Sequence, residues 1–268
     1  MGISVAATLL ALVVGASPAA ESRSPVLDAE RAGATPSDAT RPAPEKQSAL
    51  RRLAGDFGRT LTSEDSRWIF GIGGAATLLA LPLDDSIQQS RFNSELHDSA
   101  PLDGVFEGGD LAGDWWIQLG APLGLLACGK LAGRPPVMEL GGDLLRAQIV
   151  AGTITTALKL ATQRERPDGS SDLSFPSGHT SAAFATAAVV HGRYGWKPGV
   201  VAYAVAAWVG ASRINENKHF LSDVTFGAAI GIAAGRAVTL STRSVRVSVA
   251  PLVAPGARGV QVTLARQR

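Results

Sequence analysis

Three short segments near the middle of the chain hold the residues whose types and spacing suit chemistry. They read KLATQRERP (159–167), PSGH (176–179) and SRINENKHFLSD (212–223). Between them they supply fixed positive charges, imidazoles and a carboxylate. Fixed cations can neutralise a phosphoryl group, and an oriented neutral imidazole can attack its phosphorus. The residue types therefore predict phosphoryl chemistry.

The third segment pairs an imidazole with a carboxylate. Asp223 follows His219 by four residues, a spacing that places two side chains on one face of a helix. The carboxylate can then accept the Nδ1–H bond, which leaves Nε2 unprotonated and available as a nucleophile. The alternative is an ordinary surface His–Asp pair, which contributes less than ~1 kcal/mol.

The second segment places a Ser-Gly pair where a helix is predicted to begin. The free N–H groups and the dipole of a helix N-terminus favour an anion. Gly178 lets the backbone approach the ligand closely, and His179 follows directly. Taken alone, Ser177 and Gly178 fit a simple helix cap equally well.

The first segment contributes two cations. Lys159 and Arg166 are seven residues apart, about two helical turns, and are predicted on one face near the end of helix 145–162. Pro167 is predicted to end that helix. Taken alone, two cations with their aliphatic stems along a helix surface would explain this pair.

The elements that must position these segments are apolar runs rich in Ala, Gly, Leu and Val. Their length and their lack of period-two alternation predict buried helices, and hence an all-α antiparallel bundle of about six helices. Small residues allow close helix contacts, yet most runs fall short of the ~20 residues that a membrane span needs. The runs cover 68–83, 115–130, 145–162, 179–192, 198–212 and 219–240.

The direction of these helices predicts that the three segments meet. Helix 145–162 ends at the first segment, and helix 179–192 begins directly after PSGH. Helix 198–212 ends beside Arg213, and helix 219–240 begins at His219. In an up-and-down bundle all these ends lie together. Separate structural explanations of each segment do not predict such a meeting.

The N-terminal region is predicted to precede the helical domain. Residues 1–20 resemble a signal peptide with cleavage near Ala19 or Ala20, although no Lys or Arg precedes the apolar run. An uncleaved membrane anchor is the alternative. Residues 21–66 are predicted to be a Pro/Ala-rich linker with a possible amphipathic helix over 47–65.

The helical domain is expected to cover 67–240. Its acidic break at 84–114 is interpreted as a solvated loop rather than a metal site, because no EF-hand spacing is present. Valines alternate with polar residues after the last helix, which predicts a small C-terminal β-hairpin over 241–268.

Composition narrows the class of protein. Hydrophobic residues make up 46% of the chain and charged residues 18%, so a sizeable core can form. The formal net charge of +2 gives no bias toward nucleic acid, and no nucleic-acid partner is predicted. The single cysteine, Cys128, excludes an internal disulfide and a thiolate metal site, and its apolar neighbours predict that it is buried.

Together the segments resemble a known family. Their patterns are Lys159-x6-Arg166-Pro167, Pro176-Ser177-Gly178-His179 and Ser212-Arg213-x5-His219-x3-Asp223. These are similar to the three signature motifs of the type 2 phosphatidic acid phosphatase (PAP2) family. That superfamily also includes bacterial nonspecific acid phosphatases and vanadium haloperoxidases. Every signature position is filled, and the resemblance covers 159–223 with helical flanks over 68–240.

The resemblance implies a role for each residue. His219 would attack phosphorus, Asp223 would orient it, and His179 would protonate the leaving alcohol and then help to activate water. No metal or other cofactor is implied, and His97 and His191 receive no role. The implied phosphate-binding residues are Lys159, Arg166, Ser177, Gly178 and Arg213.

The resemblance also implies a function. We expect a metal-independent phosphatase that hydrolyses phosphomonoesters or lipid (pyro)phosphates through a phosphohistidine. The alternatives are a vanadium-dependent haloperoxidase, with vanadate in the same cradle, and a non-catalytic envelope protein. The expected partner is a phosphorylated lipid or a small phosphomonoester, and the substrate and oligomeric state stay open.

The expected location is the bacterial cell envelope, with membrane association and the active site on the periplasmic side. If helices 68–83, 115–130 and 145–162 all spanned a membrane after an exported arm, the third would end in the cytoplasm. An integral protein and a periplasmic domain that contacts the membrane therefore both remain open.

Overall fold

The computed structural model describes residues 49–92, 100–242, 245–254 and 257–266. The predicted signal peptide and most of the predicted linker lie outside these residues. The chain divides into Met1–Arg52 and Leu53–Arg268. The described helices and strands lie in the second of these units, apart from the first residues of one helix.

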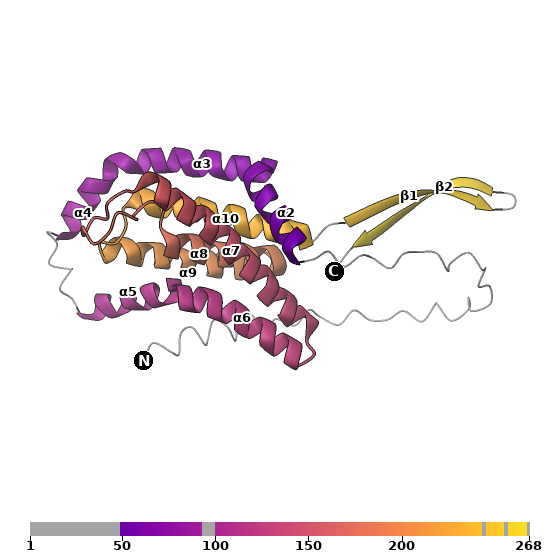
Figure 1. Ribbon diagram of the computed structural model, residues 1–268, viewed down its shortest axis with the longest axis horizontal. Helices are drawn as coiled ribbons and strands as arrows, with labels where there is room; N and C mark the ends of the chain where they lie inside the picture. Colours follow the sequence, from indigo (N-terminus) through magenta and orange to yellow (C-terminus); the bar gives the residue numbers. More distant parts are fainter. Residues whose placement is uncertain (1–48, 93–99, 243–244, 255–256, 267–268) are drawn as a thin grey trace. The chain divides into compact units, whose positions relative to one another are not determined.

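The first half of the described chain is helical (Figure 1). Ser63 caps one of them through its side chain, and Asp114 caps another, as short polar residues at helix N-termini commonly do. The elements are α2 (Ala49–Thr62), α3 (Glu64–Ala80), the short 3-10 helix η2 (Leu81–Leu83), α4 (Asp84–Phe92), α5 (Ala100–Gly113) and α6 (Trp115–Leu131).

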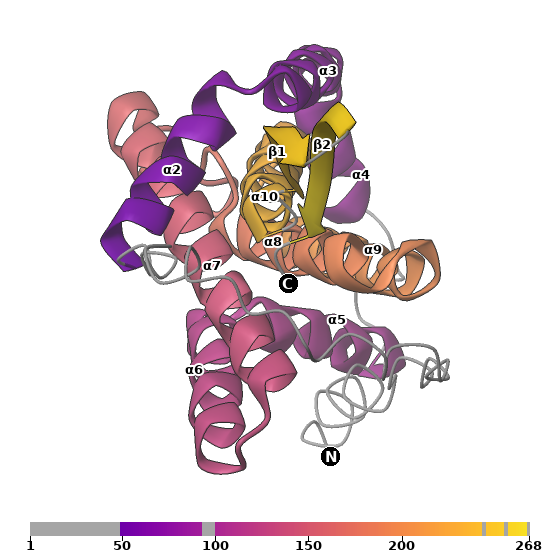
Figure 2. The same cartoon turned by 90° about the vertical axis from the view of Figure 1, so that its right-hand side faces the viewer.

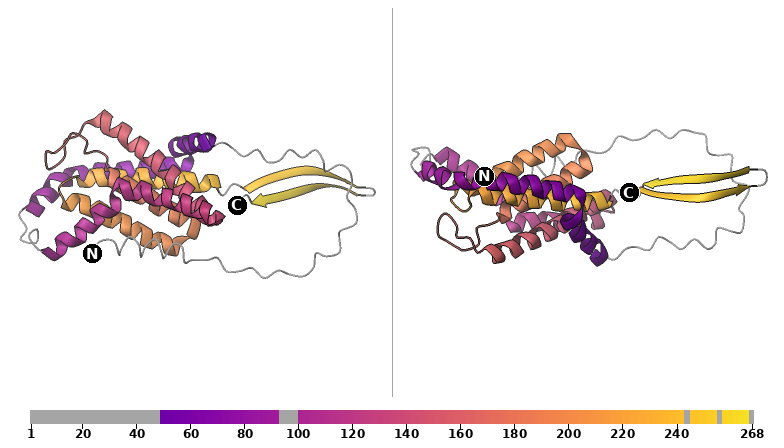
Figure 3. Two further views of the ribbon diagram at one scale, coloured as in Figure 1. Left: turned by 60° about the horizontal axis from the view of Figure 1, so that its bottom comes forward. Right: turned by 90° about the horizontal axis from the view of Figure 1, so that it is seen from above.

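The second half forms the centre of the bundle. In the end-on view of Figure 2, α10 lies among α3, α7 and α8, and it packs against all of these helices. Figure 3 shows α3 running along α10. The elements are α7 (Pro135–Thr162), α8 (Gly178–Tyr194), α9 (Trp196–Asn215) and α10 (Leu221–Thr242).

Small residues allow α8 and α10 to touch at the backbone. A Cβ atom at Gly235 would lie 2.6 Å from the carbonyl oxygen of Ala185, and one at Gly231 would meet the carbonyl of Ser181. Only glycine fits such contacts. The close approach fixes the start of α8 against the N-terminal half of α10, near the second and third segments singled out from the sequence.

The helical fold class predicted from the sequence is confirmed, since helices dominate the described residues. The prediction of a loop over 84–114 was wrong for the described part of this stretch, because residues 84–92 form α4 and residues 100–113 form α5. Two of its carboxylates, Asp84 and Asp85, lie in the first turn of α4, where the helix dipole favours negative charge.

The C-terminal region contains strands β1 (Val245–Ala254) and β2 (Ala257–Arg266), which pair antiparallel. Their register runs from Val245 opposite Arg266 to Ala254 opposite Ala257. They coincide in position with the predicted hairpin. The hairpin as a separate unit with the boundaries 241–268 stays a prediction.

Several helices expose apolar side chains. Along α3, Trp68, Ile72, Leu78 and Leu79 are each at least 67% exposed, which is unusual for a helix that faces water. By length and composition, Glu64–Gln89 and Leu221–Ser241 are candidate membrane spans, and the second is largely covered by protein. Cys128 on α6 is exposed, so the prediction of a buried cysteine was wrong.

Candidate active site

The proposed nucleophile lies in the turn that leads into α10. His219 is buried, and its Nδ1 atom is 3.5 Å from Oδ2 of Asp223, slightly beyond an ordinary hydrogen bond. Burial lowers the pKa of His219 to about 4, and the charges of Lys159 and Arg166 act in the same direction while Asp223 opposes them. The imidazole is therefore neutral at pH 7, as a nucleophile must be.

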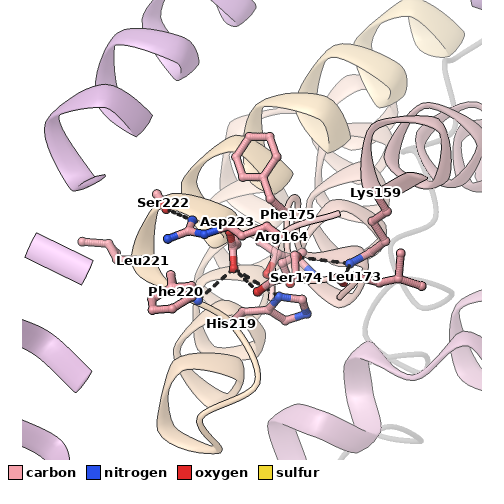
Figure 4. Close-up of polar contacts among 12 residues, drawn as sticks. Lys159, Arg164, Leu173, Ser174, Phe175, His219, Phe220, Leu221, Ser222 and Asp223 are labelled. Carbon is pink, nitrogen blue, oxygen red and sulfur yellow. Dashed lines mark hydrogen bonds and ion pairs between the residues drawn. The ribbon is translucent and has the colours of Figure 1, made fainter. Parts of the chain in front are cut away.

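The carboxylate of Asp223 is fixed from several sides (Figure 4). The hydroxyl of Ser174 donates to Oδ2 at 2.5 Å, and the backbone N–H of Phe220 donates to the same oxygen at 2.9 Å. Arg164 donates to Oδ1 from Nη1 at 2.8 Å. Because three donors hold this carboxylate, it presents Oδ2 to the imidazole in one orientation.

Sequence reasoning missed two members of this cluster. Arg164 lies inside the first segment, but only its neighbour Arg166 matches the motif spacing. Asp84 belongs to the stretch that was interpreted as a solvated loop, yet its side chain is buried and pairs with Arg164. The only sequence signal was a second arginine beside the motif arginine.

Lys159 reaches the site from the last turn of α7. Its ammonium group donates to the carbonyl oxygens of Leu173 and Ser174. Burial, reinforced by the charge of Arg166, lowers the pKa of Lys159 to about 8. The lysine lies beside the start of α8, since a Cβ atom at Gly178 would be 3.9 Å from Lys159 Cε.

Arg166 lies beyond the helix that was predicted to carry it. Helix α7 ends at Thr162, and Gln163 takes the left-handed conformation of a C-cap with φ of 45°. The chain turns there. Lys159 and Arg166 therefore do not share a helical face, and the prediction that Pro167 ends the helix was wrong. Among the described residues, the buried Nε of Arg166 has no hydrogen-bond partner.

Arg213 lies within α9 rather than just past its end. Its Nη1 is 2.6 Å from Oδ1 of Asp110, and Nη2 pairs with Glu216. Its buried Nε has no hydrogen-bond partner in the part of the chain that the structure describes. The carbonyl of Arg213 accepts a bond from the backbone N–H of His219 at 3.2 Å, which joins Arg213 to the turn that carries His219.

His179 lies in the first turn of α8 and faces α5. Its Nε2 is 3.2 Å from Oδ1 of Asp110, the same oxygen that binds Arg213. Burial lowers the pKa of His179, and Arg213 lowers it further, whereas the carboxylates of Asp110 and Asp114 oppose the shift. Asp110 was not among the residues singled out from the sequence.

The Ser-Gly pair lies where the sequence predicts a helix start. Helix α8 begins at Gly178, and Ser177 is its N-cap. The Ser177 hydroxyl accepts bonds from the backbone N–H and the hydroxyl of Thr180. The backbone N–H of Ser177 donates to the carbonyl of Asp223 at 3.0 Å. This last bond joins the second segment to the third.

All eight residues singled out from the sequence thus lie around the ends of α7 and α9 and the starts of α8 and α10. Cations, imidazoles and unpartnered N–H donors face one another there, an arrangement suited to a tetrahedral anion. Within the described ranges, no three Asp, Glu, His or Cys side chains gather as metal ligands would.

Comparison with known proteins places this site in a family. A family model described as PAP2 superfamily matches residues 141–246, which include all three segments. This match and the curated relatives support membership of the PAP2 superfamily.

Curated relatives of this chain include lipid A phosphatases. A lipid A 1-phosphatase from Porphyromonas gingivalis is 35% identical over 165 residues, which are 60% of this chain and 35% of the relative. A lipid A 4'-phosphatase from Helicobacter pylori is 33% identical over 108 residues, which are 40% of this chain and 51% of the relative. The chain therefore spans about a third to a half of the length of these relatives.

Two solved structures are similar to this chain. The crystal structure of Aquifex aeolicus LpxE matches 61% of this chain and 95% of its own, with 24% identity and a TM-score of 0.43. A PAP2 type phosphatidylglycerolphosphate phosphatase from Bacillus subtilis matches 72% of this chain and 93% of its own, with 20% identity and a TM-score of 0.47.

Proposed function

We propose that this PAP2 protein is a metal-independent phosphatase that hydrolyses a lipid-linked phosphate through a phosphohistidine on His219. One observation carries the proposal. A buried, neutral His219 lies among three cations, and the N–H groups at Nε of Arg166 and Arg213 have no partner among the described residues. Buried donors without partners are costly unless a ligand satisfies them, and a phosphoryl group has the oxygens to do so.

The first chemical step would form the phosphoenzyme. Nδ1 of His219 faces Asp223, so Nε2 is the nitrogen free to attack. Its lone pair bonds to phosphorus while the bond from phosphorus to the substrate oxygen breaks. That oxygen takes a proton from His179, and the alcohol leaves. Lys159, Arg166 and Arg213 neutralise the phosphoryl oxygens as charge spreads over them.

The second step would release phosphate. His179, now neutral, takes a proton from a water molecule whose oxygen attacks phosphorus. The P–N bond breaks, inorganic phosphate leaves, and Nε2 of His219 regains its lone pair. Asp223 keeps the Nδ1 proton of His219 in place through both steps, because its carboxylate stabilises the cationic imidazole of the intermediate.

The substrate class is inferred from the relatives and from the surface. Both relatives described above are named for removing phosphate from lipid A. Trp115 and Trp116 begin α6, stack on each other and are at least 55% exposed, as aromatic residues at a membrane interface commonly are. A phosphate carried on a lipid at the membrane surface fits both observations better than a freely soluble phosphomonoester.

We further propose that the active-site end of the bundle faces the periplasm. The helix ends and turns at the opposite end are basic. Lys130 lies near the end of α6 and Arg134 just before α7, while Arg193 lies near the end of α8 and Lys197 near the start of α9. Lys and Arg are enriched in cytoplasmic loops. If Glu64–Gln89 spans once, α2 then lies in the cytoplasm, and residues 1–20 would not act as a signal that carries α2 across.

Phosphate release from defined lipids tests this function. The full chain in detergent is given lipid A, phosphatidylglycerolphosphate or para-nitrophenyl phosphate, with a chelator present. We expect release from a lipid substrate, loss of at least a thousandfold in His219→Ala, and full activity in the control His191→Ala, whose ring packs on Tyr203 away from the site. Full activity of His219→Ala, or peroxide-dependent halide oxidation with vanadate instead of hydrolysis, would refute the proposal.

A further inference from the structure

We propose that Arg164 and Asp84 are positioning residues that hold the Asp223 carboxylate ionised and aimed at His219, and so set the protonation state of the nucleophile. This inference rests on the proposed function. Neither residue occupies a fixed position of the three motif patterns, and Asp84 belongs to α4, a helix that the motifs do not include.

Arg164 holds two carboxylates at once. Nη1 donates to Asp223 Oδ1 at 2.8 Å and to the Ser222 hydroxyl at 2.6 Å, while Nη2 donates to Asp84 Oδ2 at 2.9 Å. Its guanidinium also lies 4.0 Å from the centre of the Phe220 ring. A planar fork of donors can make all these contacts together, which a lysine ammonium cannot do.

Asp84 completes a closed set of bonds from the first residue of α4. Oδ1 accepts the backbone N–H of Ser222 at 3.0 Å, and Oδ2 accepts the Ser222 hydroxyl at 2.6 Å. The same helix sends Gln88 to the carbonyl of His219 at 3.3 Å. Helix α4 therefore contacts the chain on both sides of Phe220, at His219 and at Ser222.

The burial of these groups argues for more than a surface ion pair. The side chains of Asp223 and Asp84 are at most 4% exposed, and that of Arg164 is 28% exposed. A buried carboxylate that loses its cation tends to take up a proton. A protonated Asp223 could not stabilise the cationic imidazole that forms when Nε2 of His219 bonds to phosphorus.

Arg164 and Asp84 are expected to affect the protonation of His219 in opposite directions, because they carry opposite charges. Asp223 faces the ring from α10, Lys159 from α7 and Arg166 from the following loop, and the carboxylate opposes the two cations. Arg164 adds a positive charge behind Asp223, and Asp84 adds a negative charge behind Arg164. Removal of the positive charge of Arg164 therefore favours protonation of His219 and Asp223. Removal of Asp84 leaves Arg164 paired with Asp223 alone and therefore disfavours this protonation.

The test compares Arg164→Gln and Asp84→Asn with Arg164→Lys and with the control Arg236→Gln. Arg236 forms an exposed pair with Asp65 at 2.7 Å, away from the site. The acid limb of kcat/KM reports protonation of the free enzyme's nucleophile. We expect this limb to move up by about one pH unit in Arg164→Gln and down in Asp84→Asn, since one unit corresponds to a tenfold change in the proton equilibrium. Arg236→Gln should leave it in place.

The same variants also separate positioning from charge. Arg164→Lys keeps the positive charge but cannot bridge both carboxylates, so we expect a nearly normal acid limb with kcat reduced about tenfold or more. Thermal unfolding of each variant shows whether it is folded. A purely structural role would lower the unfolding temperature of Arg164→Gln and Asp84→Asn without moving their acid limbs apart.

A measurement without catalysis keeps this inference distinct from the proposed function. Side-chain nitrogen NMR of the histidines follows the titration of His219 directly, and His219→Gln identifies its signal. We expect the His219 titration to move in opposite directions in Arg164→Gln and Asp84→Asn, even if no phosphate ester proves to be a substrate. Identical titrations in the two variants would overturn the inference, whereas absence of phosphatase activity in the native protein would overturn only the proposed function.

Discussion

The carboxylate of Asp110 lies 2.6 Å from Nη1 of Arg213, and the same oxygen is 3.2 Å from Nε2 of His179. A carboxylate of the protein itself thus contacts the cation and the imidazole that are proposed to act on phosphate. A phosphoryl oxygen that binds to Arg213 must compete with this carboxylate. Asp110 also favours the protonated form of His179, which the proposed acid step requires.

Replacement of Asp110 should change phosphate affinity and the alkaline side of the pH profile. In Asp110→Asn we expect vanadate and phosphate to bind about two- to fivefold more tightly, because a partly exposed ion pair contributes up to about 1 kcal/mol. The pKa of His179 should fall further, so the alkaline limb of activity should move to lower pH. Inhibition curves and pH–rate profiles measure both effects, and unchanged values for both would contradict this role of Asp110.

Helix α5 should be sensitive to added volume where it touches His179. A Cβ atom at Gly113 would lie 2.6 Å from Val209 Cγ1 and 2.9 Å from His179 Cδ2. We expect Gly113→Ala to lower kcat at least tenfold and to destabilise the fold by about 1–3 kcal/mol through overpacking. Gly124→Ala is the matched control, since nothing lies within 4 Å of its Cβ position. Equal kinetics in the two variants would show that α5 does not position His179.

The buried nucleophile should make the fold sensitive to acid. The folded pKa of His219 is about 4, below its ordinary value of 6.5. The unfolded state therefore binds more protons between these values, and the free energy of unfolding should decrease as the pH falls from about 6.5 to about 4. The difference of about 2.5 units corresponds to about 3 kcal/mol.

Denaturant unfolding at pH 7 and at pH 4 measures this contribution. We expect His219→Gln, which cannot take up the proton, to lose less stability than the native chain over this range. His191→Gln serves as the control and should follow the native chain. A native chain and a His219→Gln variant with the same loss of stability would show that the imidazole is not buried in its neutral form.

The proposed orientation in the membrane can be tested with single cysteines. In a Cys128→Ala background, Asp172→Cys lies in the exposed loop at the active-site end, and Leu131→Cys lies at the opposite end, where Leu131 is 88% exposed. We expect a membrane-impermeant maleimide to label Asp172→Cys in intact cells but Leu131→Cys only after permeabilisation. The reverse pattern would contradict a periplasmic active site, and labelling of both in intact cells would contradict a spanning bundle.

The motif residues and the helices that carry them could be predicted from local sequence patterns. Helix α8 begins at Gly178 because Ser177 is a favourable cap, and α7 and α9 follow from apolar runs of helical length. Such signals are local, since they depend on neighbours within a few positions of the chain. The direction of the helices then predicted that these residues would meet at one end of a bundle.

The further groups that surround the motif residues depend on helix packing and could not be predicted from the sequence. Arg164 and Asp84 are 80 positions apart, and Asp110 reaches Arg213 and His179 from a helix that the sequence did not predict. The left-handed turn at Gln163 likewise separated Arg166 from the helical face expected for it. Contacts of this kind depend on how whole helices pack. Neither residue spacing nor composition indicates that packing. A buried Asp and a solvated Asp, for example, look the same in a sequence.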